Sequence, residues 1–441
     1  MSGEEEERQL LCAWGSNSCG QLGLGSREDA LCPQRVPGFP GKRQVIQSIS
    51  GGGSHSAAVT DAGELYVCGQ NKNGQLGLGH CEDLPRFSLC PAVLNLRVVK
   101  VSCGWDFSII LTENGLLLSC GSNAFNQLGI PQQKSSSVPN PVQNLKEKVV
   151  DIAAGLRHSL ALTESGQTLQ WGSGLASHAK RFCHRKSIHP FYTAEEPYPV
   201  PGLEDVKAVQ VTAGSYHSVA LSAAGELCVW GSNKHGQLLH PECFVLQPHR
   251  IERAMFHGEP IRAVWSGWSH LVAQTESGQV CSWGRSDYSQ LGIDGSVVPG
   301  AKEEDDRVPA GSFTPPASVP GLAGAAQIAC GSEHTLALCG NTVYSWGWNE
   351  HGMCGTGSED NVPTPTAVCI PHSNTVKLIG CGAGHSMVLC VSSGQSIQLL
   401  SSESEEHFSR SDTFSYRPSL TNVFSWNHFP DFTPFFVVVF V

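Results

Sequence analysis

Short runs of alternating apolar and polar residues recur along the chain, and each run leads through a turn into a second one. Residues 159–163 (Ser-Leu-Ala-Leu-Thr) are followed by Glu164-Ser165-Gly166, and residues 168–171 (Thr-Leu-Gln-Trp) then resume the pattern. Short runs with period two predict β-strands, and so brief a connection predicts a hairpin. A three-residue connection that ends in glycine suits a type I turn followed by a left-handed residue. The same glycine recurs at Gly63, Gly115, Gly225, Gly278 and Gly394. We therefore expect an all-β chain of repeated hairpins.

A first repeated word, Gly-x-x-His, stands before each hairpin. One copy, Gly104-Trp105-Asp106-Phe107, carries a phenylalanine in place of the histidine. The other copies are Gly52 to His55, Gly155 to His158, Gly214 to His217, Gly267 to His270, Gly331 to His334 and Gly382 to His385. Self-similarity at a fixed period indicates a repeat architecture, and this word is present in seven copies.

A second word, an aromatic residue or cysteine followed by glycine, comes after all but the last copy of the first. It reads Cys68-Gly69, Cys120-Gly121, Trp171-Gly172, Trp230-Gly231, Trp283-Gly284 and Trp346-Gly347, and a further copy, Trp14-Gly15, stands alone near the N-terminus. Successive repeats are about 51 to 64 residues apart. This is longer than a WD40 blade of roughly 40–45 residues and near a kelch blade of roughly 50. A kelch-type propeller remains the fold-level alternative, although a Gly-Gly doublet occurs only around Gly51–Gly53.

The unpaired words at the two ends complete one another. Trp14-Gly15 has no Gly-x-x-His word before it, and His385 has no Trp-Gly word after it. We therefore predict a seven-bladed β-propeller whose N- and C-terminal strands share the closing blade, which protects the strand edges that an open stack would expose. Residues 1–9 form an acidic leader and residues 10–394 the propeller. Residues 395–441 carry no repeat word, so we expect a disordered tail, with a docking peptide as the alternative.

Composition excludes several classes of function. The net charge of −11 argues against nonspecific binding to nucleic acid, and the apolar end at residues 435–441 is far shorter than the ~20 residues that span a bilayer. The chain has eighteen cysteines but neither a Cys-x-x-Cys pair nor an apolar signal segment, so we expect free thiols. The histidines are spread one per repeat, and we expect neither a metal site nor a cofactor.

A third word, Asn-x-x-Gly-Gln-Leu-Gly, often follows the second. It is complete at Asn17–Gly23 and Asn71–Gly77, and less perfect at Asn123–Gly129 and Asn233–Leu238. We interpret it as a tight turn towards the next strand. Its glycines could be mistaken for a phosphate cradle, but no Gly-x-x-x-x-Gly-Lys-Ser/Thr motif follows, so nucleotide binding there is disfavoured.

The three words together, across roughly 385 of 441 residues, resemble the repeat of the regulator-of-chromosome-condensation family. The resemblance implies a propeller that acts on a small GTPase as a guanine nucleotide exchange factor. Within the family the chain is most similar to members acting in protein secretion, which implies secretory machinery as a further partner. Exchange factors bind the nucleotide-free GTPase better than the loaded one and need no nucleophile, so we predict no catalytic residue.

An irregularity after Trp171-Gly172-Ser173 gives the first group of candidate binding residues. The third word is lost there, and we expect a long loop until Pro197 and Pro201 bring the chain back. In the founding family member a wedge at such a place reaches the GTPase. Basic and aromatic side chains on a loop can anchor an acidic protein surface, and a solvated insertion is the alternative. The candidates are Lys180, Arg181, Phe182, Arg185 and Lys186, accompanied by His184, His189, Phe191 and Tyr192.

The Gly-x-x-His words give the second group, because the resemblance implies that the residues inside them line the GTPase-facing mouth. The candidates are Asp106, Arg157, Tyr216, Trp268 and Glu333. In the family, acidic side chains in two neighbouring blades support exchange, and the matching places here hold Leu156 and Tyr216. Asp106 and Glu333 are the only carboxylates in any such slot, which weakens the expectation of efficient exchange.

The repeated histidines, in contrast, we interpret as structural. One histidine per blade at a fixed place suits hydrogen bonds between strands better than titration, and Phe107 shows that the slot accepts an apolar ring. These residues are His55, His158, His217, His270, His334 and His385.

Two classes of function remain open. The first is a GTPase regulator, acting as a monomer in the cytoplasm, with the nucleus as a second compartment. The second is a non-catalytic propeller scaffold. A chromatin-bound exchange factor is disfavoured because Glu4–Glu7 make the N-terminus acidic. A second insertion, Asp294–Ser318, carries Glu303, Glu304, Asp305 and Asp306, and we expect a solvated loop.

Overall fold

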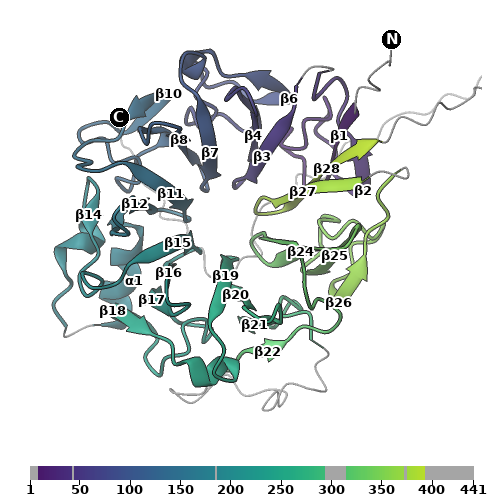
Figure 1. The fold of residues 1–441 in the computed structure, drawn as a ribbon. Helices are drawn as coiled ribbons and strands as arrows, with labels where there is room; N and C mark the ends of the chain where they lie inside the picture. Colours follow the sequence, from purple (N-terminus) through teal and green to yellow (C-terminus); the bar gives the residue numbers. More distant parts are fainter. Residues whose placement is uncertain (1–7, 42–43, 184–185, 294–313, 372–374, 393–441) are drawn as a thin grey trace, which may run out of the picture. The chain divides into compact units, whose positions relative to one another are not determined.

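Seven antiparallel sheets of four strands each are arranged around a central axis (Figure 1). This computed structural model describes residues 8–41, 44–183, 186–293, 314–371 and 375–392. The predictions for the N-terminal residues before Arg8, for the acidic run at residues 303–306 and for the tail lie outside these ranges. No helix in the described ranges is long and apolar enough to cross a membrane.

The blades follow one another in chain order, and we number them 1 to 7 starting from the closing blade. Blade 1 consists of β27 (Thr375–Cys381), β28 (His385–Ser392), β1 (Arg8–Gly15) and β2 (Ala30–Arg35), and blade 2 of β3 (Ile46–Gly51), β4 (His55–Thr60), β5 (Leu65–Gly69) and β6 (Leu84–Leu89). Blade 3 consists of β7 (Val98–Cys103), β8 (Phe107–Thr112), β9 (Leu117–Ser122) and β10 (Ser135–Pro141). Blade 4 consists of β11 (Val149–Ala154), β12 (Ser159–Thr163), β13 (Thr168–Trp171) and β14 (Tyr198–Pro199). Blade 5 consists of β15 (Ala208–Ala213), β16 (His217–Ser222), β17 (Leu227–Ser232) and β18 (Phe244–Arg250). Blade 6 consists of β19 (Ile261–Ser266), β20 (His270–Thr275), β21 (Val280–Gly284) and β22 (Ala317–Ser318). Blade 7 consists of β23 (Gln327–Cys330), β24 (His334–Cys339), β25 (Thr342–Gly347) and β26 (Val362–Ala367).

Blade 1 closes the ring with strands from both ends of the chain. β1 pairs antiparallel with β28 in an unbroken register from Arg8↔Ser392 to Gly15↔His385. The predicted seven-bladed propeller with a shared closing blade is therefore confirmed.

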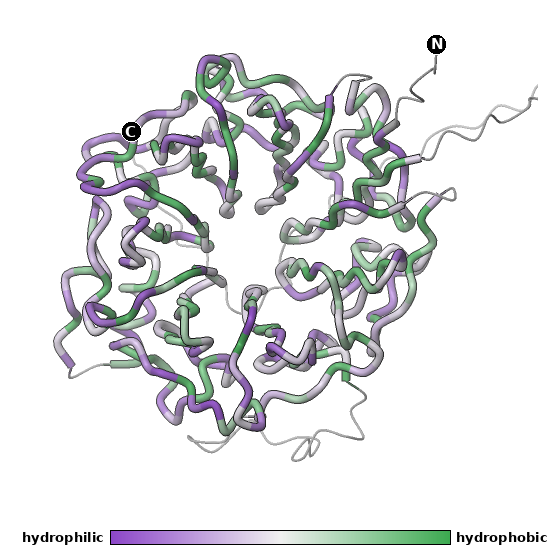
Figure 2. The backbone as a smooth tube through the Cα atoms, in the orientation of Figure 1, coloured by the Kyte–Doolittle hydropathy of each residue, from purple (hydrophilic) through white to green (hydrophobic). Residues whose placement is uncertain are grey.

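The core consists of apolar layers between neighbouring blades. Figure 2 shows hydrophobic segments recurring around the ring instead of gathering in one place. The first five residues of the second strand are buried in all seven blades. This strand begins at the repeated histidine or Phe107, except in blade 4, where it begins one residue later, at Ser159. The five tryptophans of the Trp-Gly words are fully buried, so each fills the space between two sheets.

The turns that join these strands define two faces. The Gly-x-x-His turns and the third-word loops lie on one side of the ring, which we call the mouth face; the Gly-ended hairpins lie on the other, the reverse face. The hairpin glycine has the expected left-handed backbone, with φ of +91° at Gly166 and +82° at Gly63.

In the residues that the structure describes, helical structure is confined to short connections. Three single 3-10 turns there, Pro91–Val93, Pro190–Thr193 and Arg253–Phe256, join strands, and the α-helix α1 (Gly174–Phe182) follows β13. The prediction of a long loop after Trp171 is therefore wrong at its start. Leu175, Ala176 and Ala179 form an apolar stripe with helical spacing, and all three are buried against blade 5. Burial of this stripe stabilises a helix that the repeated strand pattern of the sequence did not indicate.

Candidate partner-binding face

Main-chain hydrogen bonds join the Gly-x-x-His turns around the centre of the mouth face. Trp268 N donates to Ser332 O at 2.8 Å, Ser332 N to Ala383 O at 3.1 Å, and Ala383 N to Gly52 O at 2.9 Å. Gly53 N to Gly104 O and Ser215 N to Trp268 O continue the series. Within the described ranges, no main-chain bond joins the turn of blade 4 to the turn of blade 3 or blade 5. The ring of turns is thus interrupted at Leu156, in the blade that carries α1.

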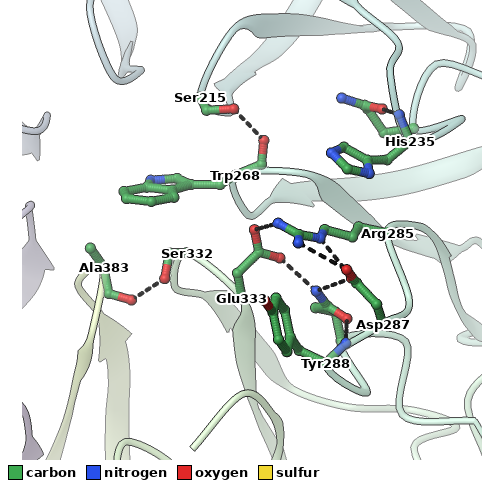
Figure 3. A network of polar contacts seen from close by, with 11 residues as sticks. Ser215, His235, Trp268, Arg285, Asp287, Tyr288, Ser332, Glu333 and Ala383 are labelled. Atoms are coloured by element: carbon green, nitrogen blue, oxygen red, sulfur yellow. Dashed lines mark hydrogen bonds and ion pairs between the residues drawn. The ribbon is translucent and has the colours of Figure 1, made fainter. Parts of the chain in front are cut away.

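Two tryptophans from opposite sides of the ring meet over this centre. The Trp105 and Trp268 rings are 5.3 Å apart between centroids, although their blades are three positions apart around the ring. Both rings are half-buried and line a central cavity of about 90 Å³ with the other turns. Figure 3 shows Trp268 extending from its turn, whose carbonyl accepts the Ser215 hydroxyl at 2.7 Å. The cavity is too small for a nucleotide. We call the two indoles, Trp105 and Trp268, the aromatic platform of the mouth face, because they can contact only what lies on the surface.

Glu333 lies in a polar network beside this platform (Figure 3). Its carboxylate accepts from Gln290 Nε2 at 2.9 Å and lies 3.5 Å from Arg285 Nη1. Arg285 also forms a bidentate pair with Asp287, at 2.6 and 2.9 Å, and lies over the Tyr288 ring. Burial raises the pKa of Glu333 to about 7. Glu333 is 3 % exposed, so it faces its own blades more than a partner, and Arg285, Asp287 and Tyr288 carry the exposed part of this network.

Asp106 holds a similar position in blade 3. Gln127 Nε2 donates to Asp106 Oδ1 at 3.4 Å, and Asn73 Nδ2 donates to Asp106 Oδ2 at 3.5 Å. Burial raises the pKa of this carboxyl, while Ser122 and Arg157 act in the opposite direction. The two mouth carboxylates are therefore tied to side chains of the third-word loops.

A row of rings and cations runs from blade 3 to blade 5 beside α1. The Arg157 guanidinium lies 4.2 Å from the centre of the Phe125 ring, and Tyr216 stacks on His178 of α1 at 3.8 Å. Burial raises the pKa of Tyr216, and the nearby charge of Arg157 lowers it. The structure thus brings together Arg157, Tyr216 and α1, which the sequence analysis proposed from separate segments.

The remaining candidates of this segment separate into surface and core residues. Lys180 and Arg181 lie exposed in the last turn of α1, and neither makes an ion pair within the described ranges. Lys186 Nζ pairs with Glu242 Oε1 at 2.7 Å, Phe182 is half-buried, and Arg185 lies outside the described residues. Phe191 and Tyr192 are buried, and the Tyr192 hydroxyl lies 3.1 Å from Val245 O and 3.0 Å from Leu246 O. The expectation that these two rings are presented on a loop is therefore wrong, because they attach the segment to blade 5.

The six repeated histidines contact the neighbouring blade. Each Nε2 lies 2.8 to 3.0 Å from a serine or threonine hydroxyl of the next blade; the pairs are His55–Ser108, His158–Ser218, His217–Ser266, His270–Thr335, His334–Ser386 and His385–Ser56. Ser56 Oγ also donates to Gln21 O at 2.7 Å, so its only proton is used there and it accepts from His385 Nε2–H. All six Nδ1 atoms are buried without a partner. Burial lowers the pKa of each ring to about 3 or 4, which keeps the histidines neutral.

The third word organises the mouth-face loops through its asparagine and glutamine, which the sequence analysis did not single out. Asn17 Oδ1 accepts from Leu22 N and its Nδ2 donates to Glu28 O, and equivalent bonds recur at Asn71, Asn123, Asn233 and Asn349. The main-chain carbonyl of the glutamine accepts the indole proton of the next blade, as in Trp171 Nε1 to Gln127 O at 2.9 Å. The recurrence of this asparagine and glutamine at the same positions of the third word was the sequence signal that could have indicated their structural role. In the part that the structure describes, no group of three or more His, Cys, Asp or Glu could hold a metal ion.

A seven-bladed ring with these three words and an N-terminal strand in the closing blade is the fold of RCC1-like domains. The family model described as RCC1-like domain matches residues 10–388, so the chain belongs to this family. It is 53 % identical over 385 residues to the secretion-regulating guanine nucleotide exchange factor of Bos taurus, covering 86 % of this chain and 83 % of that protein. The Mus musculus protein of the same name is 51 % identical over 391 residues, with the same coverage.

A solved structure gives the same result for the fold. Prp20p of Saccharomyces cerevisiae, whose binding properties to Gsp1p and histones were described with its crystal structure, superposes with a TM-score of 0.75. The identity is 25 %, covering 87 % of this chain and 91 % of Prp20p.

Proposed function

We propose that this chain is a guanine nucleotide exchange factor or GTPase-binding regulator that acts in protein secretion. The relatives that share about half of its residues over most of both chains carry that activity in their name. Prp20p, which has the same fold, is described with its binding properties to Gsp1p. The partners proposed are a small GTPase and the secretory machinery, and the proposed compartment is the cytoplasm, with the nucleus second.

An exchange factor works by binding energy, so the relevant feature is a surface. Such a protein stabilises the nucleotide-free GTPase relative to the loaded one, and no proton transfer or covalent step is required of its side chains. A rigid ring suits this task, because a preorganised surface loses little conformational entropy on binding. The propeller unit, residues 10–394, supplies this surface.

The single observation that carries the site assignment is the position of α1. The helix follows the end of β13 on the mouth-face side, its His178 stacks on Tyr216, and Lys180 and Arg181 lie exposed in its last turn. Exposed cations next to a half-buried ring are typical of a surface that meets an acidic patch on a partner. Trp105 and Trp268 offer an aromatic contact at the centre of the same face, the usual place of energetic hot spots.

Nucleotide-release kinetics with a panel of purified small GTPases test the proposal. We expect the chain to accelerate release of a fluorescent GDP analogue from at least one member, and Lys180→Glu/Arg181→Glu to reduce that acceleration at least tenfold. Lys207→Glu/Arg262→Glu is the matched control: it changes the net charge equally, at exposed residues where β15 and β19 begin, away from the mouth face. Equal loss in both variants would contradict the assignment to α1.

A non-catalytic scaffold is the second candidate, and one observation favours it. The places where the family resemblance implies acidic exchange residues hold Leu156, which is 3 % exposed, and Tyr216, which stacks on His178. Neither can act as a carboxylate. Stable binding to one GTPase without faster nucleotide release from any member would favour the scaffold over the exchange factor.

A further inference from the structure

A second surface, distinct from the Gly-x-x-His turns and from α1, lies on the outer rim between blades 3 and 4. It is a groove of about 580 Å³, and no residue of a Gly-x-x-His turn lines it. One wall is the connection between the two blades, at Asn144, Lys146 and Glu147. The other wall is residues 194–199, which lead into the outer strand β14.

The groove accompanies an unusual feature of blade 4. In five other blades the outer strand has six or seven residues, whereas β14, like β22 of blade 6, has two and pairs with β13 only at Leu169↔Pro199 and Gln170↔Tyr198. Pro197 and Pro199 have no N–H, so this edge offers few main-chain donors to an added strand. A ligand here must therefore bind mainly through side chains.

The groove combines an apolar surface with carboxylates. Pro131, Leu169, Pro197, Tyr198 and Pro199 line it, and the Tyr198 ring is 40 % exposed although it packs edge-on against His189. An exposed ring next to prolines is an apolar contact surface of the kind that binds an extended segment.

The charge of the groove selects the partner. Glu147, Glu195 and Glu196 face one cation, Lys146, and none of the three carboxylates forms an ion pair within the described ranges. Neutral groups orient them instead. Asn144 Nδ2 donates to Glu196 Oε2, and Asn126 Nδ2 donates to Glu195 Oε1 at 3.4 Å. Hydrogen bonds from Ser165 and Thr163 hold the pKa of Glu147 below its usual range.

We propose that this groove binds an extended, arginine-containing segment of a partner protein. A guanidinium matches the planar carboxylates through paired N–H donors and can also stack on Tyr198. Nucleic acid does not fit, because its phosphates would meet three carboxylates. No residue of the Gly-x-x-His turns or of α1 lines the groove, so it is a surface distinct from the one that carries Lys180 and Arg181.

Binding of a short synthetic peptide of Arg, Ser and Gly to the full chain tests the proposal, with fluorescence anisotropy as the readout. The same peptide with every Arg replaced by Glu is the ligand control. We expect Glu195→Gln/Glu196→Gln to weaken binding of the Arg peptide about tenfold and Tyr198→Ala to weaken it further.

The variant Glu82→Gln/Glu252→Gln is the protein control, since it removes two exposed carboxylates elsewhere and changes the net charge equally. Equal weakening by both double variants would mean that the peptide senses only the general negative charge, and the proposal would be overturned. Failure of the parent chain to bind the Arg peptide would overturn it as well. Circular dichroism of every variant verifies that these surface changes leave the fold intact.

Discussion

The glycine of each Gly-x-x-His word is present because the histidine ring occupies the space of a side chain. A Cβ at Gly267 would lie 2.1 Å from His270 Cε1, and a Cβ at Gly104 would lie 2.1 Å from Phe107 Cε1. Glycine and ring are therefore one packing unit. The phenylalanine copy shows that the ring shape, more than the imidazole, satisfies this unit.

The buried imidazoles make the folded state sensitive to acid. Their pKa values in the folded chain, about 3 to 4, lie below the ordinary value of 6.5, so between these limits the unfolded chain binds protons that the folded chain does not. Stability is therefore complete above about pH 6.5 and falls as the pH decreases through this window, by up to about 1.4 kcal/mol per pH unit for each histidine.

His270→Phe isolates one of these contributions. Between pH 7.5 and pH 5 the parent chain should lose about 2 kcal/mol more unfolding free energy than this variant, because one protonation site of the unfolded state is removed. Urea unfolding at the two pH values measures the difference. His80→Phe, at an exposed position, is the control. An unchanged pH dependence in His270→Phe would show that His270 is not held neutral in the folded chain.

At the scale of elements, the Gln170 side chain of blade 4 provides the hydrogen-bond acceptor that a third-word loop provides in other blades. Elsewhere the buried tryptophan donates to a main-chain carbonyl of the preceding third-word loop, but blade 4 has no such loop. Trp230 Nε1 instead donates to the Gln170 side-chain carbonyl at 2.7 Å, and Ser218 Oγ donates to the same atom at 3.2 Å. Gln170 is fully buried, so a single amide takes the place of the missing loop.

Gln170→Leu should therefore be costly although leucine matches the size of the side chain. It leaves the indole N–H of Trp230 buried without an acceptor, which costs about 1–3 kcal/mol of unfolding free energy. Denaturant unfolding of this variant beside Gln143→Leu, at an exposed position, measures the effect. Gln170 Nε2 is buried without a partner, so a cost of less than about 0.5 kcal/mol would mean that its removal offsets the lost bond or that Trp230 finds another acceptor.

The sequence predicted the elements that repeat and missed those that occur once. The hairpins and the turn glycines follow from words present in almost every blade. The helix α1 occurs once, and its apolar stripe has only three small or medium residues, Leu175, Ala176 and Ala179, so periodicity alone could not separate it from a basic loop. The stacking of Tyr216 on His178 depends on where that helix packs, and no sequence word encodes it.

At the scale of the whole molecule, counting words was sufficient to predict the closure of the ring. Trp14-Gly15 without a preceding histidine and His385 without a following tryptophan are the two halves of blade 1. The meeting of Trp105 and Trp268 across the mouth was not predictable in this way, because it depends on the ring diameter and on the orientation of both turns.

Removal of β1 tests how far the ring depends on this closure. Deletion of residues 2–15 takes away the fully buried Leu11 and Trp14, and loss of a buried tryptophan alone costs about 3–5 kcal/mol. We expect the midpoint of thermal unfolding to fall by more than about 10 °C. Deletion of residues 2–7, which stops before β1, should leave it unchanged in calorimetry. Equal melting of the two truncated chains would show that the remaining blades are stable as an open ring.

The pairing of β1 with β28 also sets the order of events at the ribosome. Gly15 can pair with His385 only after about 370 further residues have been synthesised. At roughly 5–20 residues per second this takes on the order of 20 to 75 s, during which the edges of β1 have no long-range partner. Blades 2 to 7 can form as they emerge, since their strands are consecutive in the chain. The final closure is a late step of synthesis, because β28 ends at Ser392 of 441 residues, so the nascent chain is exposed to aggregation and chaperone binding until β28 is made.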